Sequence, residues 1–137
     1  MDLQIIFQLF LAAILGSLIG LEREYKRKGA GLQTYSLVSL GACFFSIISL
    51  SLTEANIIKD PAPIILAIAL GTGFIGAGSI SRGEGRIEGL TTAAGIWITA
   101  AIGLATGASF YFVAFFVTFL TILILAGLGL IEEKFFR

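Results

Sequence analysis

The chain has 137 residues, of which 57% are hydrophobic and only 13% are charged, and its nine Lys and Arg balance nine Asp and Glu. Soluble domains are roughly 45–50% apolar and about 25% charged, so this composition excludes an ordinary globular enzyme and a disordered chain. It indicates a protein of the lipid bilayer. The zero net charge leaves no basic surplus for nucleic acid. With no His and only Cys43 as a thiol, we expect no enzyme, cofactor or bound metal.

Five apolar stretches are long enough to cross a membrane, which requires about 20 largely apolar residues each. They comprise residues 3–21, 32–52, 62–80, 89–108 and 110–131, and none of them contains Asp, Glu, Lys or Arg. The sequence therefore predicts an all-α integral membrane protein. We expect a compact bundle of five transmembrane helices, forming a single domain over residues 1–137. Because Asp2 is the only charged side chain among the first twenty residues, the first stretch is expected to be a retained span rather than a leader.

The distribution of basic residues predicts the orientation of these spans. One side holds eight of them and the other side holds only Lys59; the eight are Arg23, Lys26, Arg27, Lys28, Arg82, Arg86, Lys134 and Arg137. Basic residues accumulate in cytoplasmic connections. With five spans, this predicts an outside N-terminus and a cytoplasmic C-terminus.

Small residues recur at a spacing of four in two of the predicted spans. In lipid, such residues mark places where helix backbones approach closely, so we expect helix packing at Gly16 and Gly20 of the first span and at Gly95, Gly103 and Gly107 of the fourth. The third span is densest in glycine, with Gly71, Gly73, Gly76 and Gly78. Two interpretations remain open for it: close packing, or a broken helix whose carbonyls line a polar cavity.

A few charged or polar residues at the span ends are candidates for function. Arg23, Glu24 and Arg82 lie nearest the apolar spans, and since a buried charge needs a partner, we predict a contact between Glu24 and Arg82. Asp60 precedes Pro61 and is expected to cap the third span; the alternative is an acidic residue at the mouth of a site. Thr92 begins or lines the fourth span.

Several ordered motifs carry a family resemblance across nearly the whole chain. They are Ile19–Glu24, Gly31–Thr34 with Leu37–Ala42, Gly73–Ile80, and Gly89–Trp97 with Ala100–Gly103. Together they resemble the MgtC/SapB family of bacterial inner-membrane proteins.

The resemblance implies a five-helix hydrophobic domain in the bacterial cytoplasmic membrane, in the short form that lacks a C-terminal regulatory domain. Some members of this family are linked to growth under magnesium limitation and to restraint of the F-type ATP synthase. The family pattern matches at six positions, which become the functional candidates: Arg23, Glu24, Asp60, Arg82, Thr92 and Trp97. It departs from the pattern at Gln33, Pro63, Ala67, Thr91 and Ile98.

Two functions are weighed on this basis. The first is a non-enzymatic membrane protein that regulates ion or magnesium homeostasis, or a complex such as the F-type ATP synthase, through helix contacts. It would act on another membrane protein or as a homo-oligomer, with a dimer favoured. The alternative is a transporter or channel for an ion or small solute that uses the Gly-rich third span. A continuous helix over residues 64–80 with no polar cavity beside it would argue against the alternative.

Overall fold

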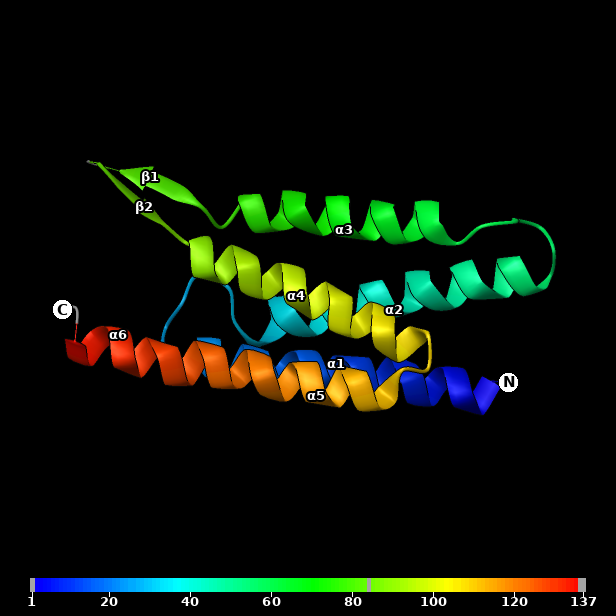
Figure 1. The fold of residues 1–137 in the computed structure, drawn as a ribbon, viewed down its shortest axis with the longest axis horizontal. Coiled ribbons are helices and arrows are strands. Elements are labelled where there is room, and N and C mark those ends of the chain that lie inside the picture. Colours follow the sequence, from blue (N-terminus) through cyan, green and yellow to red (C-terminus); the bar gives the residue numbers. More distant parts are fainter. Residues whose placement is uncertain (1, 84, 136–137) are drawn as a thin grey trace.

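The computed structural model describes residues 2–83 and 85–135, and these residues form long helices that lie side by side (Figure 1). Helix α1 (Asp2–Tyr25) runs antiparallel to α2 (Leu32–Glu54), followed by α3 (Ala62–Ala77), α4 (Leu90–Gly107) and α5 (Tyr111–Leu123). The helix α1 begins at one end of the molecule, and the last helix, α6 (Gly129–Phe135), lies at the other. The expectation of an all-α protein is confirmed apart from one small pair of strands.

Four of the helical segments are long and apolar enough to cross a membrane: Asp2–Tyr25, Leu32–Glu54, Leu90–Gly107 and Tyr111–Ile131. The segment α3 is apolar but has only 16 residues, which at 1.5 Å per residue is about 24 Å. The predicted third span, residues 62–80, thus extends past the C-terminal end of the observed helix at Ala77. After Ala77 the chain turns, because Ser79 and Ile80 donate backbone hydrogen bonds to Gly76 and Ala77 in short turns.

The connection between α3 and α4 is a β-hairpin. Strand β1 (Ser81–Gly83) pairs antiparallel with β2 (Arg86–Glu88), so that Arg82 faces Ile87 in the register. All six strand residues are exposed. The hairpin extends outward from the ends of α3 and α4 at one end of the bundle (Figure 1), and we call this the hairpin end.

The last predicted span, residues 110–131, is one rod built from three segments (Figure 1). The helix α5 passes into a π-helical turn, η1 (Ile124–Leu128), which passes into α6. A π-turn shifts the backbone hydrogen-bond pattern within a helix.

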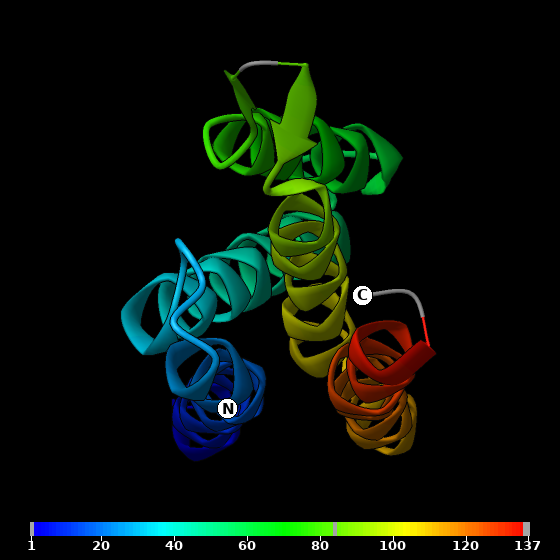
Figure 2. The same ribbon diagram turned by 90° about the vertical axis from the view of Figure 1, so that its left-hand side faces the viewer.

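The core of the bundle lies between α1, α2 and α4. Figure 2 views the molecule from the hairpin end and shows α4 in the middle, with α3 on one side of it and α1 and α5 on the other. The largest fully buried side chain is Tyr35 of α2, which packs in a cluster with Leu15 and Ile19 of α1 and Ile96 of α4. The outward faces carry exposed aromatic residues such as Phe10, Phe74 and Phe112, as expected for surfaces that meet lipid.

The glycines of the first and fourth spans sit where α2 packs against them. A Cβ atom added at Gly16 would lie 2.5 Å from the Tyr35 carbonyl oxygen, and one at Gly20 would lie 2.7 Å from Leu32 Cα. On α4, an added Cβ would collide with the Ser39 carbonyl oxygen at Gly103, and would lie 2.5 Å from the Cys43 carbonyl oxygen at Gly107. The two glycine-bearing helices therefore share α2 as a close-packed neighbour.

The glycines of α3 are placed differently. Gly76 alone approaches another helix, with an added Cβ 3.2 Å from the Ala93 carbonyl oxygen of α4. At Gly71 and Gly73 an added Cβ would meet nothing within 4 Å, and at Gly78 it would meet only Ile75 of its own turn. Although it is densest in glycine, this span lies at the margin of the bundle rather than at its packed centre.

Candidate functional site

A cluster of polar side chains lies at the hairpin end, where α1 ends and α4 begins. Arg23, in the last turn of α1, is only 3% exposed. Its Nη2 donates to Thr92 Oγ1 on α4 at 3.5 Å, and its Nη1 lies 3.3 Å from Glu22 Oε2. The Nε of Arg23 is buried and has no hydrogen-bond partner among the described residues. Arg23 and Thr92, both selected from the sequence, are thus brought together.

Tyr35 completes this cluster from α2, and the sequence analysis did not select it. Its hydroxyl donates to the Thr92 carbonyl oxygen at 3.1 Å, and its side chain is fully buried. Gly95 makes room for that hydroxyl, since an added Cβ there would lie 2.6 Å from it. A tyrosine near the start of an apolar span resembles an interfacial aromatic residue, so the sequence pattern alone did not indicate a buried role.

Lys26 links the cluster to the last helical rod. Its ammonium lies 3.1 Å from Glu22 Oε1, one helical turn back, and donates to the Leu125 carbonyl oxygen at 3.0 Å. Leu125 lies within the π-turn η1. The hydrogen bond from Lys26 to Leu125 therefore connects the end of α1 to the last helical rod.

The other selected residues lie apart from this cluster. Glu24 accepts a hydrogen bond from the Leu32 backbone N–H at 3.2 Å, while Arg82 lies exposed on β1. The predicted contact between Glu24 and Arg82 is therefore not formed, because the hairpin carries Arg82 away from the end of α1. Asp60 is exposed and accepts from the Ala62 N–H at 2.9 Å, although the N-cap residue of α3 is Pro61 rather than Asp60. Trp97 is 53% exposed on the outer side of α4.

A second polar cluster lies at the opposite end of the bundle, around Gln8. This side chain is 4% exposed, and its Nε2 donates to the carbonyl oxygens of Thr106 at 3.2 Å and Gly107 at 3.0 Å and to Ser109 Oγ at 3.0 Å. A helix ends with carbonyl groups that have no partner in the helix. Gln8 binds two of them at the end of α4.

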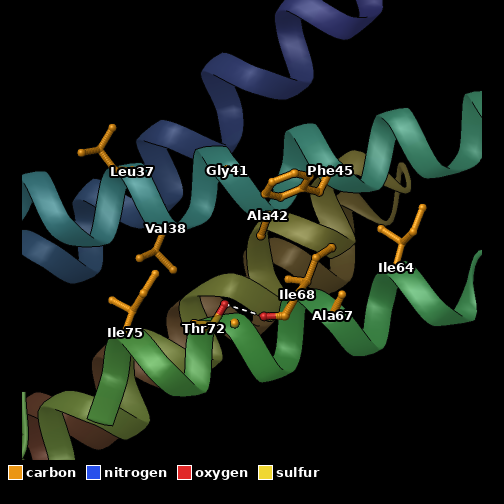
Figure 3. Close-up of a pocket in the computed structure, with 11 residues that line it drawn as sticks. Leu37, Val38, Gly41, Ala42, Phe45, Ile64, Ala67, Ile68, Thr72 and Ile75 are labelled. Carbon is orange, nitrogen blue, oxygen red and sulfur yellow. Dashed lines mark hydrogen bonds between the residues drawn. The ribbon is translucent and has the colours of Figure 1, made fainter. Parts of the chain in front are cut away.

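An apolar groove of about 390 Å³ lies between α2 and α3 (Figure 3). Its walls include Gly41 of α2 and Gly71 of α3, and an added Cβ at either position would meet nothing within 4 Å. The single hydroxyl in the lining, Thr72 Oγ1, donates to the Ile68 carbonyl oxygen at 2.7 Å within its own helix. The groove therefore offers small and apolar surface with no free polar group on Thr72.

The described polar residues form helix contacts and hydrogen bonds. Among the side chains that the structure describes, no three of His, Cys, Asp or Glu converge as metal ligands. Cys43 is buried, and its Sγ lies 3.6 Å from the Gln8 carbonyl oxygen as a weak donor.

Comparison with known proteins connects the chain to a family. It is 42% identical over 132 residues to YhiD of Escherichia coli K12, named as a candidate magnesium transporter, covering 91% of this chain and 60% of that protein. It is 42% identical to SapB of Bacillus subtilis, over 83% of this chain and 52% of SapB. It is 40% identical to MgtC of Salmonella typhimurium LT2, over 74% of this chain and 42% of MgtC.

The chain thus spans about half the length of the curated relatives it matches. No solved structure matches it. The sequence pattern that defines the MgtC family matches residues 9–134, which include the Arg23–Thr92–Tyr35 cluster and all the long helices except residues 2–8 of α1. The chain belongs to the MgtC family.

Proposed function

We propose that this protein regulates magnesium or ion homeostasis in the bacterial inner membrane by helix contacts with another membrane protein. Membership of the MgtC family and the name of its relative YhiD support the link to magnesium. The observation that carries the mode of action is the groove between α2 and α3 with its open glycines. In lipid, small residues let helix backbones approach, and Gly41 and Gly71 leave such a surface uncovered.

The proposed orientation places the hairpin end in the cytoplasm and the N-terminus outside. The described basic residues at the hairpin end, from Arg23 to Lys28 and on the hairpin, outnumber Lys59 at the other end. This distribution is the one expected of cytoplasmic connections. The groove then faces sideways into the bilayer, where it is accessible to a transmembrane helix of a partner such as a subunit of the F-type ATP synthase, which the family resemblance implies.

Transport of an ion or solute is the alternative, and the name of YhiD favours it. The shape of α3 argues against it. The helix is continuous from Ala62 to Ala77 and then turns, so the criterion of a continuous helix over residues 64–80 is met as far as residue 77. The groove beside this part of the helix is apolar, whereas transporters place broken helices with free carbonyls at their binding sites. A protein acting through contacts alone needs no enzymatic chemistry, which accords with a non-enzymatic role.

Capture of the partner tests this function. The full chain, tagged and cross-linked in its own bacterial membrane, is compared with Gly71→Leu, which fills the groove, and with Gly73→Leu on the same helix, which lies outside it. We expect Gly71→Leu to lose at least tenfold of the captured partner and Gly73→Leu to retain it. Capture of a second copy of this chain would show that the partner is the protein itself, in a homo-oligomer. A strict monomer that captures nothing and conducts Mg²⁺ into liposomes would contradict the proposal.

A further inference from the structure

A polar pocket of about 530 Å³ lies at the hairpin end, distinct from the apolar groove. The α1–α2 connection, the α3–α4 connection and the first turn of α4 form its walls. Arg27 and Lys28 come from the α1–α2 connection, Ser79 follows α3, and Glu88 ends β2, while Thr92 comes from the first turn of α4. Two basic side chains and one carboxylate therefore line the pocket, together with hydroxyl groups.

The start of α4 supplies further positive potential to this pocket. The helix has 18 residues and its first turn has no side-chain cap, so the backbone N–H groups there are free to bind an acceptor. Gly89, which precedes it, has φ +87°, and an added Cβ would collide with the Ser79 carbonyl oxygen. Only glycine both adopts this positive φ and leaves room for the Ser79 carbonyl group. Gly89 therefore allows the turn after α3 to pack against the start of α4.

Buried Arg23 adds positive charge beside the pocket, although it is not one of the lining residues. Its guanidinium contacts the hydroxyl of Thr92 at 3.5 Å, and Thr92 lines the pocket. Glu22 is paired with both Arg23 and Lys26, so this group retains one positive charge in excess. Arg27 and Lys28 against Glu88 leave a second. The buried Nε of Arg23, with no hydrogen-bond partner among the described residues, leaves one donor unsatisfied.

We propose that this pocket binds a phosphate group, supplied by a lipid headgroup or by a soluble phosphate compound. Free N–H groups at a helix N-terminus bind phosphate, and Arg and Lys pair with phosphate oxygens. A divalent cation would find one carboxylate, Glu88, among two cations. The site does not depend on the helix-contact function, since it shares no lining residue with the groove.

The test uses the purified full chain in a maltoside detergent, which carries no phosphate. One arm adds phosphatidylglycerol, with diacylglycerol as the matched lipid without phosphate, and counts bound lipid by native mass spectrometry. The other arm adds inorganic phosphate and measures the shift in melting temperature. The variants are Arg27→Asn, which tolerates the positive φ of 52° at this position, and Lys28→Gln. Lys134→Gln, a cation of α6 outside the pocket, is the control.

We expect phosphate-dependent binding in at least one arm, weakened about tenfold by each pocket variant, as for loss of one charge-assisted hydrogen bond, and unchanged by Lys134→Gln. Phosphatidylglycerol binding alone identifies a lipid headgroup, and stabilisation by inorganic phosphate identifies a soluble source. Binding in neither arm, or equal weakening by Lys134→Gln, would overturn the proposal. Because both pocket residues are exposed, the variants should keep the wild-type melting temperature without ligand, which the second arm also records.

Discussion

Glycine has different roles at the packed centre of the bundle, where α2 meets α1 and α4, and at its margin on α3. Where α2 meets α1 and α4, an added Cβ at Gly16 or Gly103 would run into backbone atoms. On α3, Gly71 and Gly73 meet nothing within 4 Å. Glycine at the centre therefore permits contacts within this chain, whereas at the margin it leaves surface for a contact outside it. A small-residue motif in a membrane helix consequently indicates close packing without saying which chain supplies the neighbour.

The largest effect is expected from a substitution at the packed centre of the bundle. Gly103→Ala places a methyl group against the Ser39 carbonyl oxygen, and overpacking of this kind costs about 1–3 kcal/mol. We expect Gly103→Ala to lower the free energy of unfolding in detergent by about 3 kcal/mol. The matched change Gly71→Ala should leave it equal or raise it by up to about 1 kcal/mol, because alanine favours helix. Equal destabilisation by both would remove the distinction between centre and margin.

A smaller effect is expected at the hairpin end, where the centre is held by polar contacts. Thr92→Val keeps the shape of the side chain but removes the hydroxyl that accepts from Arg23. Leaving a buried donor unsatisfied costs about 1–3 kcal/mol, so we expect a loss of about 2 kcal/mol. A double-mutant cycle with Arg23→Gln measures the coupling, and strict additivity of the two changes would show that the 3.5 Å contact contributes nothing.

The smallest effect is expected at the opposite end. Gln8→Leu removes the amide that binds the Thr106 and Gly107 carbonyl oxygens, and polar contacts between membrane helices average about 0.6 kcal/mol. Chemical denaturation should show a loss of about 1 kcal/mol. Gln4→Leu, whose donor reaches only Ser109 Oγ at 3.4 Å in an exposed position, serves as the comparison and should change little. If Gln4→Leu costs as much, capping of α4 is not the role of Gln8.

Hydropathy and charge were enough to predict the helices, because a bilayer allows few alternatives to an apolar helix. They did not predict the end of α3 at Ala77 or the strands on either side of Gly85, which depend on local turns. Periodicity marked the glycines of α1 and α4, yet it could not show that α2 is their common neighbour. The small residues of α2, such as Ser39 and Cys43, do not form a glycine stripe.

The candidate site was predicted only in part. Arg23 and Thr92 were each placed near the same end of the bundle, but their pairing across 69 positions of sequence depends on how α1 and α4 cross. Arg82 is equally close to the spans in the sequence, but the hairpin places it on an exposed strand. Tyr35 was missed because its burial follows from the space left at Gly95, a property of two helices together rather than of either sequence segment.

The position of Lys26 has a mechanical consequence. Its ammonium reaches Glu22 on one side and the Leu125 carbonyl oxygen on the other, and Gly129 lies close enough that an added Cβ would be 2.9 Å from it. Turning the last helical rod about its own axis must first break this bond. The Lys26 ammonium would then keep only Glu22, which is also paired with Arg23. The rotational position of the C-terminal rod is therefore linked through one side chain to the ion pairs of the buried guanidinium.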